Sequence, residues 1–550
     1  MISILRRAVF AAALLAALPV HAQDRDIPDR SDPGVIRGER EEREAPVRRE
    51  PRLRVPTPQA EPTTAPGEEV VAGAIRVVGA TRIPTAAFAQ AIEPYLGRPL
   101  EQADLVRLAT DIAGVLRRSG YGLATAWVPA QDMVGGILTV QVDEGRIDEI
   151  RASGPAADLV EQRLSGLTGS QPVRTDRLER QLLLAGDLAG LWVGDARLVR
   201  EGGRNILTVE TRYDRLRGQV RIDNWGTRSV GPLRAWGEVE ANGVAARGDS
   251  LLVGAATTPL DPGEFQLVEA RYRVPVGPGG TMIGFGGYVG RTRSDSETND
   301  DLAGDSSEFE VEASQPLTRS RDASVWLTGR LELRDSRLDR GGIPLREDRI
   351  VSATASLYGS GKLAGGRLRG RLSLVQGLDL LGATRRGDPL ASRANAGGVF
   401  TKLEAWAEYV RPLGGGFSLE LATRSQVADG PLLSGEEMGL GGPQFLRAFD
   451  YRERSGDEGV AASGELRFDL KDFAGRADKV QLYGYADGGR IRNLGITSRS
   501  RGTLASAGLG ARITLDRRWE AGLELGVPLT DGAEDQNPRP RFSFSLTRRF

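Results

Sequence analysis

Apolar and polar residues alternate with a period of two over most of the C-terminal part of the chain. After Asp214 the helical period disappears, and short alternating segments follow with Gly, Asp and Ser between them. Clear examples are residues 216–223, 367–374, 465–470 and 505–513. Such segments predict strands that have one apolar face and one charged face. A soluble β-sandwich shows the same alternation and is the first alternative.

Three features favour a transmembrane barrel over a sandwich for residues 214–550. The apolar faces recur without any helical segment that could cover them, and the opposite faces carry clustered arginines that suit a wet lumen. In lipid, only a closed barrel satisfies the backbone of such strands. At roughly 20 residues per strand and connection, this length holds about 16 antiparallel strands. The polar stretches 291–307 and 335–348 are expected to be outside loops.

Two small α+β units precede the predicted barrel. In the first unit, strand 74–80 is followed by amphipathic helices at 85–96 and 103–120 and by strands at 123–129 and 136–145. The same order, β-α-α-β-β, recurs further along, which indicates an internal repeat. We therefore predict one module over residues 70–146 and a second over residues 147–213.

The N-terminal 22 residues have the pattern of an export signal. Arg6 and Arg7 precede the apolar run 8–18, and "VHA" forms a small-residue cleavage site. The run is too short for a spanning helix, which needs about 20 apolar residues. Residues 23–69 are rich in Pro, Arg and Glu and predict a mobile linker. A short helix at 34–44 is conceivable, but disorder is the favoured interpretation.

Composition excludes several kinds of chemistry. The chain of 550 residues has no cysteine, and its one histidine, His21, lies in the predicted signal. Cys/His metal sites and Ser–His–Asp triads are therefore excluded from the mature chain. The segment "YGSGKL" at 358–363 lacks the upstream Gly and the trailing Ser/Thr of a phosphate-binding loop. We expect no enzyme activity, metal or cofactor, and the net charge of −1 indicates no nucleic-acid partner.

Three motifs stand in a characteristic order along the chain. The first module contains "GYGLATAWVPAQDMVGGILTVQVDEGRI" at 120–147, and "GLGGPQF" precedes Leu446-Arg447-Ala448-Phe449. A later strand carries Tyr485-Ala486-Asp487-Gly488-Gly489. With the signal, the linker, the two modules and the barrel, this order resembles the two-partner secretion transporters of TpsB type. The modules resemble their polypeptide-transport-associated (POTRA) domains.

The resemblance implies a role for Arg447. In that family the loop between strands eleven and twelve folds into the lumen and bears a V/I-R-G-Y/F tetrad, while F-x-D-x-G lies on a following strand. Here Asp487 shares the polar face of its strand, so we predict an Arg447–Asp487 pair inside the barrel. An exposed loop arginine is the alternative. Ala448 replaces the family glycine, so its backbone must be ordinary or the loop tip must differ.

The resemblance also implies a function and partners. The chain would be an outer-membrane pore that secretes a partner exoprotein, bearing an N-terminal secretion domain, from periplasm to cell surface without ATP. The POTRA modules would lie in the periplasm and capture the client along an edge strand. Candidate client contacts are Trp127, Val128, Trp192 and Leu198, with core packing as the alternative for each. Phe550 would be the signal for the barrel-assembly machinery, lipid would surround the barrel, and we expect a monomer.

Three other functions compete with secretion. A barrel-assembly or lipid/protein-insertion member of the same superfamily typically has more modules, so two modules favour secretion. A barrel-anchored lipase needs a catalytic domain and a G-x-S-x-G elbow, and the chain has neither. A passive porin has no need of periplasmic modules.

Overall fold

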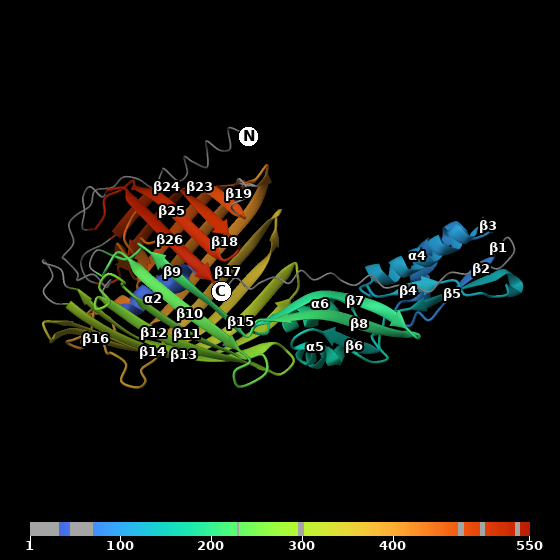
Figure 1. Cartoon of the computed structure of the whole chain (residues 1–550), viewed down its shortest axis with the longest axis horizontal. Coiled ribbons are helices and arrows are strands. Elements are labelled where there is room, and N and C mark those ends of the chain that lie inside the picture. Colours follow the sequence, from blue (N-terminus) through green and yellow to red (C-terminus); the bar gives the residue numbers. More distant parts are fainter. Residues whose placement is uncertain are drawn as a thin grey trace.

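A large β-barrel and two small α+β modules make up the described part of the protein. The structure, a computed structural model, describes residues 32–43, 70–227, 230–294, 302–470, 478–495, 501–533 and 539–550. The two modules extend in a row from one end of the barrel, and a short helix lies inside the barrel (Figure 1). The predicted signal, residues 1–22, lies outside the described residues.

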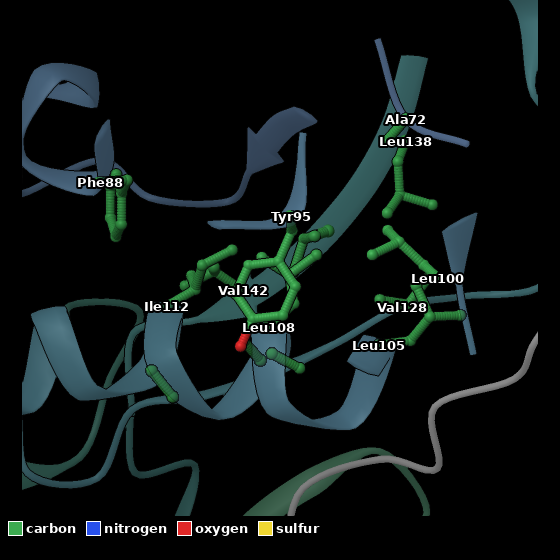
Figure 2. Close-up of a cluster of buried hydrophobic side chains, with 14 of the residues drawn as sticks. Ala72, Phe88, Tyr95, Leu100, Leu105, Leu108, Ile112, Val128, Leu138 and Val142 are labelled. Atoms are coloured by element: carbon green, nitrogen blue, oxygen red, sulfur yellow. The ribbon is translucent and has the colours of Figure 1, made fainter. Parts of the chain in front are cut away.

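The first module packs helix α4 (Gln102–Arg118) onto a three-stranded sheet of order β2-β5-β4. The buried residues of α4 recur at three- and four-residue spacing, and Glu101 and Asp104 form a capping box at its start. Figure 2 shows the core between this helix and the sheet. The other elements are β1 (Val70–Val71), β2 (Ala74–Val78), η2 (Thr85–Phe88), α3 (Ala89–Ile92), η3 (Glu93–Tyr95), β3 (Pro99–Leu100), β4 (Thr125–Trp127), η4 (Val134–Gly136) and β5 (Ile137–Asp143).

The second module repeats the arrangement of the first. Its elements are β6 (Glu149–Ser153), α5 (Ala157–Leu164), η5 (Ser165–Leu167), α6 (Thr175–Gly186), β7 (Leu191–Glu201) and β8 (Arg204–Tyr213). The sheet order is β6-β8-β7, and β6 runs parallel to β8 just as β2 runs parallel to β5. In both modules the strand after the long helix, β4 or β7, is therefore an outer strand of its sheet.

Ion pairs join the second module to the near rim of the barrel. Arg319 on a barrel strand donates to both carboxylate oxygens of Asp187 at 2.9 Å. Arg321, in the next turn, contacts Glu179 at 3.3 Å. Arg319 is buried, so its bidentate pair fixes the orientation of the module at the barrel mouth.

Sixteen strands of the described residues close into one antiparallel barrel. They are β9 (Leu216–Asp223), β10 (Arg234–Asn242), β11 (Ser250–Thr257), β12 (Phe265–Val276), β13 (Thr281–Ser294), β14 (Leu302–Arg319), β15 (Ala323–Arg340), β16 (Ile343–Leu363), β17 (Gly366–Gly377), β18 (Thr401–Gly414), β19 (Phe417–Ala428), β22 (Glu458–Leu470), β23 (Lys479–Arg492), β24 (Arg501–Leu515), β25 (Trp519–Pro528) and β26 (Arg541–Arg549). The last strand pairs with the first, so the sheet has no open edge.

The outer surface of this barrel is apolar, the reverse of a soluble protein. Val289, Phe309 and Leu331 are 62%, 55% and 58% exposed on neighbouring strands. Their chain neighbours Tyr288 and Glu308 point inward, and each has a polar partner in the lumen. A surface of this kind is stable only in lipid, and it excludes the sandwich alternative.

Residues 335–348 are largely strand, so the prediction of an outside loop there was wrong. Of the other expected loop, 291–307, residues 291–294 and 302–307 are strand, and 295–301 lie outside the described residues. Strands β15 and β16 continue to a two-glycine turn at Gly341 and Gly342, whose φ values are 55° and 79°. Cross-strand ion pairs such as Arg349–Asp335, at 2.6 Å, stabilise the polar end of this hairpin. The polar residues of this hairpin therefore belong to strands that extend beyond the apolar outer surface of the barrel.

Helix α2 (Pro33–Arg43) lies in the barrel lumen, so disorder was the wrong prediction for this part of the linker. Ile36 is 1% exposed and packs in a cluster with Trp236 and Phe265 of the wall. Arg37 forms ion pairs with Glu269 at 3.2 Å and Glu308 at 2.8 Å. The helix is too polar to form a core by itself, but the lumen supplies both an apolar patch and carboxylates.

The described residues contain neither a spanning helix nor a metal cluster. None of their helices is both long and apolar enough to cross a bilayer. Within the same residues, no group of three or more Asp, Glu, His or Cys side chains is arranged to hold a metal ion.

The seam between β26 and β9 makes the C-terminus a test of barrel assembly. This ladder has five residue pairs, the fewest of any in the described barrel, and Phe550 adds two backbone hydrogen bonds to Gly218. Deletion of Phe550 should therefore lower the amount of assembled barrel, measured by heat-modifiable gel mobility. Phe550→Leu, which keeps the backbone bonds, serves as the control. Normal assembly of the deletion variant would contradict this prediction.

Candidate functional site

A long connection between β19 and β22, the eleventh and twelfth barrel strands, folds back into the lumen. We call residues 429–457 the lumen loop. It contains η6 (Ser434–Glu436) and a small ladder of β20 (Met438–Leu440) with β21 (Arg454–Gly456). Beyond this ladder the chain turns through an apolar tip. The buried residues of the tip and of the wall around it are Met438, Leu440, Phe445, Leu446, Ala448, Phe449, Ala461, Ile491 and Leu504.

Arg447, at the tip of the lumen loop, contacts Asp487 on β23. Its Nε donates to Oδ2 at 3.1 Å, and Nη2 donates to Oδ1 at 3.2 Å. The backbone N–H of Arg447 also donates to the same carboxylate, at 3.2 Å. Both residues are buried, so the pair is charge-assisted and bidentate.

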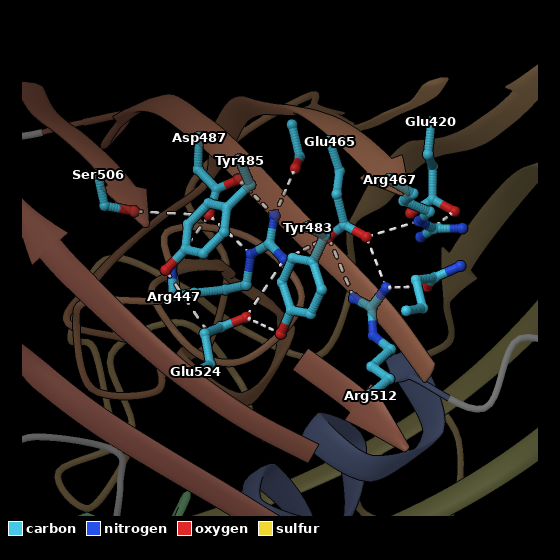
Figure 3. Close-up of polar contacts among 12 residues, drawn as sticks. Glu420, Arg447, Glu465, Arg467, Tyr483, Tyr485, Asp487, Ser506, Arg512 and Glu524 are labelled. Carbon is cyan, nitrogen blue, oxygen red and sulfur yellow. Dashed lines mark hydrogen bonds and ion pairs between the residues drawn. The ribbon is translucent and has the colours of Figure 1, made fainter. Parts of the chain in front are cut away.

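Two further carboxylates and an aromatic ring complete the surroundings of this guanidinium. Nη1 lies 2.7 Å from Glu465 on β22 and 3.4 Å from Glu524 on β25. The guanidinium carbon lies 3.5 Å from the ring centroid of Tyr485. Figure 3 shows how the four groups converge on the guanidinium from three strands. The loop is thus fixed to a broad section of wall.

A second cation balances the excess of carboxylates. Arg512 on β24 contacts Glu465 at 2.6 Å, and its guanidinium lies 3.9 Å from the ring centroid of Tyr483. The hydroxyl of Tyr483 donates to Glu524 at 2.9 Å. The hydroxyl of Ser506 donates to Asp487 at 3.5 Å, so each carboxylate near Arg447 has at least one other polar partner, which reduces the cost of burying it.

The electrostatic surroundings keep Arg447 charged. Burial disfavours the charged form, but the Asp487 carboxylate and its hydrogen bonds outweigh burial and raise the pKa of Arg447 above its ordinary value. Removing the cation would leave three buried carboxylates close together. Loss of one partner of a buried pair costs about 3–5 kcal/mol.

The backbone strain at the loop tip lies at Leu446 and not at Ala448. Leu446 has a φ of 62°, which costs an L-residue about 1–2 kcal/mol, and Ala448 has no positive φ. The side chain of Leu446 is fully buried, so its packing offsets this cost. Ala448 lies against Gly526 of β25. A Cβ added at position 526 would come within 3.1 Å of the Ala448 methyl group. An alanine at 448 is thus accommodated by a glycine in the wall.

A polar cavity of about 690 Å³ borders the loop tip on the side of β9, β10, β25 and β26. Arg447, Arg512 and Glu524 line it together with Gln219, Glu238 and Ser545. The ion pairs of helix α2 reach β12 and β14, and its Ile36 packs in one cluster with Trp236 of β10, which also lines the cavity. The lumen therefore contains the helix, the loop and a wet space beside them.

The four candidate client contacts in the modules divide into two kinds. Val128 is 0% exposed and Leu198 is 7% exposed, and both belong to module cores, which favours the alternative of core packing for these two residues. Trp192 on β7 is 40% exposed, with the Arg212 guanidinium 4.9 Å from its ring centroid. Trp127 on β4 is half-buried, and Arg200 lies 5.5 Å from its ring centroid. The two tryptophans remain candidates.

The sequence did not reveal the partners of Arg447 other than Asp487. Glu465, Arg512 and Glu524 each lie on the polar face of an alternating strand, so their inward direction could be predicted. Which residues of neighbouring strands lie at the same height depends on register, which alternation does not specify.

A closed barrel with a loop folded into its lumen and two α+β modules at its rim defines the class of outer-membrane transporters that have POTRA domains. The sequence profile of the haemolysin secretion/activation proteins ShlB/FhaC/HecB matches residues 202–513, and that of the ShlB-type POTRA domain matches residues 72–145. The first match covers more than half of the chain. The chain belongs to the ShlB/FhaC/HecB family and is a two-partner secretion-type transporter of the outer membrane.

Several proteins resemble the whole chain or a part of it. The outer membrane transporter CdiB of Escherichia coli is 24% identical over 518 residues, 88% of this chain and 84% of CdiB. The heme/hemopexin transporter protein HuxB of Haemophilus influenzae is 28% identical over 172 residues, 30% of each chain. The solved structure of E. coli CdiB covers 96% of this chain and is itself covered completely, with a TM-score of 0.74 and 22% identity.

Arg447→Gln should destabilise the folded chain, because it removes the cation from three carboxylates. We expect the free energy of unfolding to fall by about 3–5 kcal/mol, measured by urea titration in detergent micelles. Arg490→Gln, on an exposed side chain of β23, is the matched control and should change stability by about 0.5 kcal/mol or less. Equal stabilities of the two variants would show that the network does not stabilise the loop.

Proposed function

We propose that this chain exports one partner exoprotein in an unfolded state, from the periplasm to the cell surface. The modules at 70–146 and 147–213 would capture the client, and the barrel at 214–550 would conduct it. The client would carry an N-terminal secretion domain, and lipid would surround the chain, which would work as a monomer. We place no nucleotide in this cycle, because the periplasm contains no ATP.

The Arg447 network is the observation that supports this proposal most. A passive pore needs an open lumen, whereas here the loop and helix α2 occupy it. Both are held by small apolar clusters and by ion pairs and hydrogen bonds, at Arg447 and at Arg37, without covalent links. Polar contacts of this kind can exchange for contacts with water or a passing backbone, so the closure is reversible.

The outer strand of the second module is the proposed capture site. Strand β7 spans Leu191–Glu201 at the edge of its sheet, and Trp192 lies exposed near its start. An extended client segment added along such an edge gains affinity from backbone hydrogen bonds and demands little of its own sequence. The ion pairs of Asp187 with Arg319 keep this strand near the barrel mouth.

Barrel assembly or insertion of other proteins is the competing function. The BamA structure of Haemophilus ducreyi lacking POTRA domains 1–3 resembles this chain with a TM-score of 0.52 and 14% identity, which concerns the fold alone. No residue of the site favours that function over export.

Arg447→Ala should reduce export of the partner exoprotein severalfold while leaving barrel insertion largely intact. The assay compares the exoprotein in culture medium and periplasm of cells that express both proteins, with heat-modifiable mobility as the assembly control. Export at the parent level by an assembled Arg447→Ala barrel would remove the loop from the mechanism.

Trp192→Ala should weaken client capture, because an exposed aromatic side chain on the outer strand of a sheet can anchor an added strand. We expect the Kd for the purified secretion domain to rise about fivefold, which corresponds to ~1 kcal/mol. Val134→Ala, which truncates another exposed apolar side chain but lies outside both edge strands, is the control. Similar Kd values for the parent and both variants would exclude this tryptophan from capture.

A further inference from the structure

A second set of polar contacts joins three connections at the outer end of the barrel. Connections alternate between the two ends of the antiparallel barrel, and the β14–β15 turn contacts the second module, so the connection from β17 to β18, residues 378–400, lies at the opposite end; we call it the lid loop. Two of its residues, Ala396 and Phe400, pack in a buried cluster with Leu432 and Leu433 of the lumen loop. The lid loop thus rests directly on the outer part of the lumen loop.

Arg393 of the lid loop reaches into the base of the lumen loop. Its Nη1 lies 2.6 Å from Glu437 and 2.6 Å from Asp457. The same nitrogen donates to the carbonyl of Leu432 at 3.1 Å, and Nη2 donates to the carbonyl of Leu494 at 3.4 Å. The guanidinium therefore contacts both ends of the lumen loop and the connection that follows β23.

Asp457 is the acceptor at the centre of these contacts. It is 0% exposed. Besides Arg393, it accepts hydrogen bonds from the backbone N–H groups of Leu432 at 2.7 Å and Leu494 at 2.6 Å. One buried carboxylate thus connects the lid loop, the lumen loop and the β23–β24 connection.

The outer contacts share no partner with Arg447. The carboxylates that Arg447 contacts are Asp487, Glu465 and Glu524, all on strands of the wall. Arg393 contacts carboxylates at the two ends of the lumen loop instead. Sites without shared partners usually contribute independently to stability, so either set of contacts can be broken while the other persists.

We propose that Arg393 and Asp457 form an outer latch that closes the lid loop over the lumen loop. At rest the lumen is then filled by helix α2 and by the lumen loop, which Arg447 holds at the wall, and this latch closes the surface. The exported chain has to displace the lid loop before it emerges, a step that rests on the proposed function. The closure itself does not depend on a client and can be measured without one.

The latch is tested by the conductance of the purified full chain in planar lipid bilayers. Arg393→Gln and Asp457→Asn should each increase the open probability severalfold, and Arg393→Lys should restore part of the closure. Arg385→Gln is the matched control, because Arg385 lies in the same loop, its side chain is 77% exposed, and its guanidinium lies 3.8 Å from the Asp379 carboxylate. An open probability of Arg393→Gln equal to that of Arg385→Gln would overturn the latch. Heat-modifiable mobility identifies the assembled protein in every preparation.

A covalent link tests whether the lid loop must move during export. The Oγ of Ser392 in the lid loop accepts a hydrogen bond from the backbone N–H of Ser434 in the lumen loop at 3.0 Å. Because the chain has no cysteine, Ser392→Cys with Ser434→Cys introduces one pair of thiols. Bridging them with a short thiol-cleavable reagent should abolish export, and cleavage should restore it.

The outcomes of this second experiment separate the two proposals. Export at the parent rate by the bridged chain would overturn the lid movement while leaving the export function intact. Absence of export in the parent chain with its partner would contradict the proposed function itself, and the bilayer measurement would still decide whether the latch closes the pore.

Discussion

A guanidinium buried inside a membrane-embedded barrel must be met by carboxylates on the barrel wall. Arg447 satisfies this constraint with Asp487, Glu465 and Glu524, which come from three separate strands. The loop tip is therefore attached to three strands of the wall, which a single hydrogen bond could not do. The strained φ of Leu446, the close contact of Ala448 with the wall and the apolar packing of the tip are all compatible with one position of that cation.

The wall and the contents of the lumen are stabilised in different ways. Each barrel strand is hydrogen-bonded on both sides and faces lipid with apolar residues, so the wall is a permanent structure. Helix α2, the lumen loop and the lid loop are held by small apolar clusters and by ion pairs at Arg37, Arg447 and Arg393. These contacts involve few residues each and can be exchanged singly. Under the proposed function, such a pore would open for a polypeptide without unfolding its barrel.

The features that depend on local pattern could be predicted from the sequence. Alternation specified the barrel, the length of the alternating region specified its number of strands, and helical periodicity specified the two modules. The position of Asp487 on the polar face of its strand predicted its contact with Arg447, and the structure has these two side chains 3.1 Å apart. Features that depend on distant partners could not be predicted. Helix α2 is too polar to indicate burial, and the apolar patch and the carboxylates of the lumen together explain it. The polar ends of β15 and β16 resemble loops until their cross-strand ion pairs are known.

Thiol labelling of the loop tip tests the central claim most directly. Ala448 is 6% exposed, lies next to Arg447 and can be replaced in an Ala448→Cys variant of a chain that has no other thiol. If Arg447 holds the loop against the wall, the introduced thiol should react slowly with a water-soluble maleimide in the assembled barrel. The same thiol should react many times faster when Arg447→Gln is added. Equal labelling rates with and without Arg447→Gln would contradict the account, because the loop would then keep its position without the guanidinium.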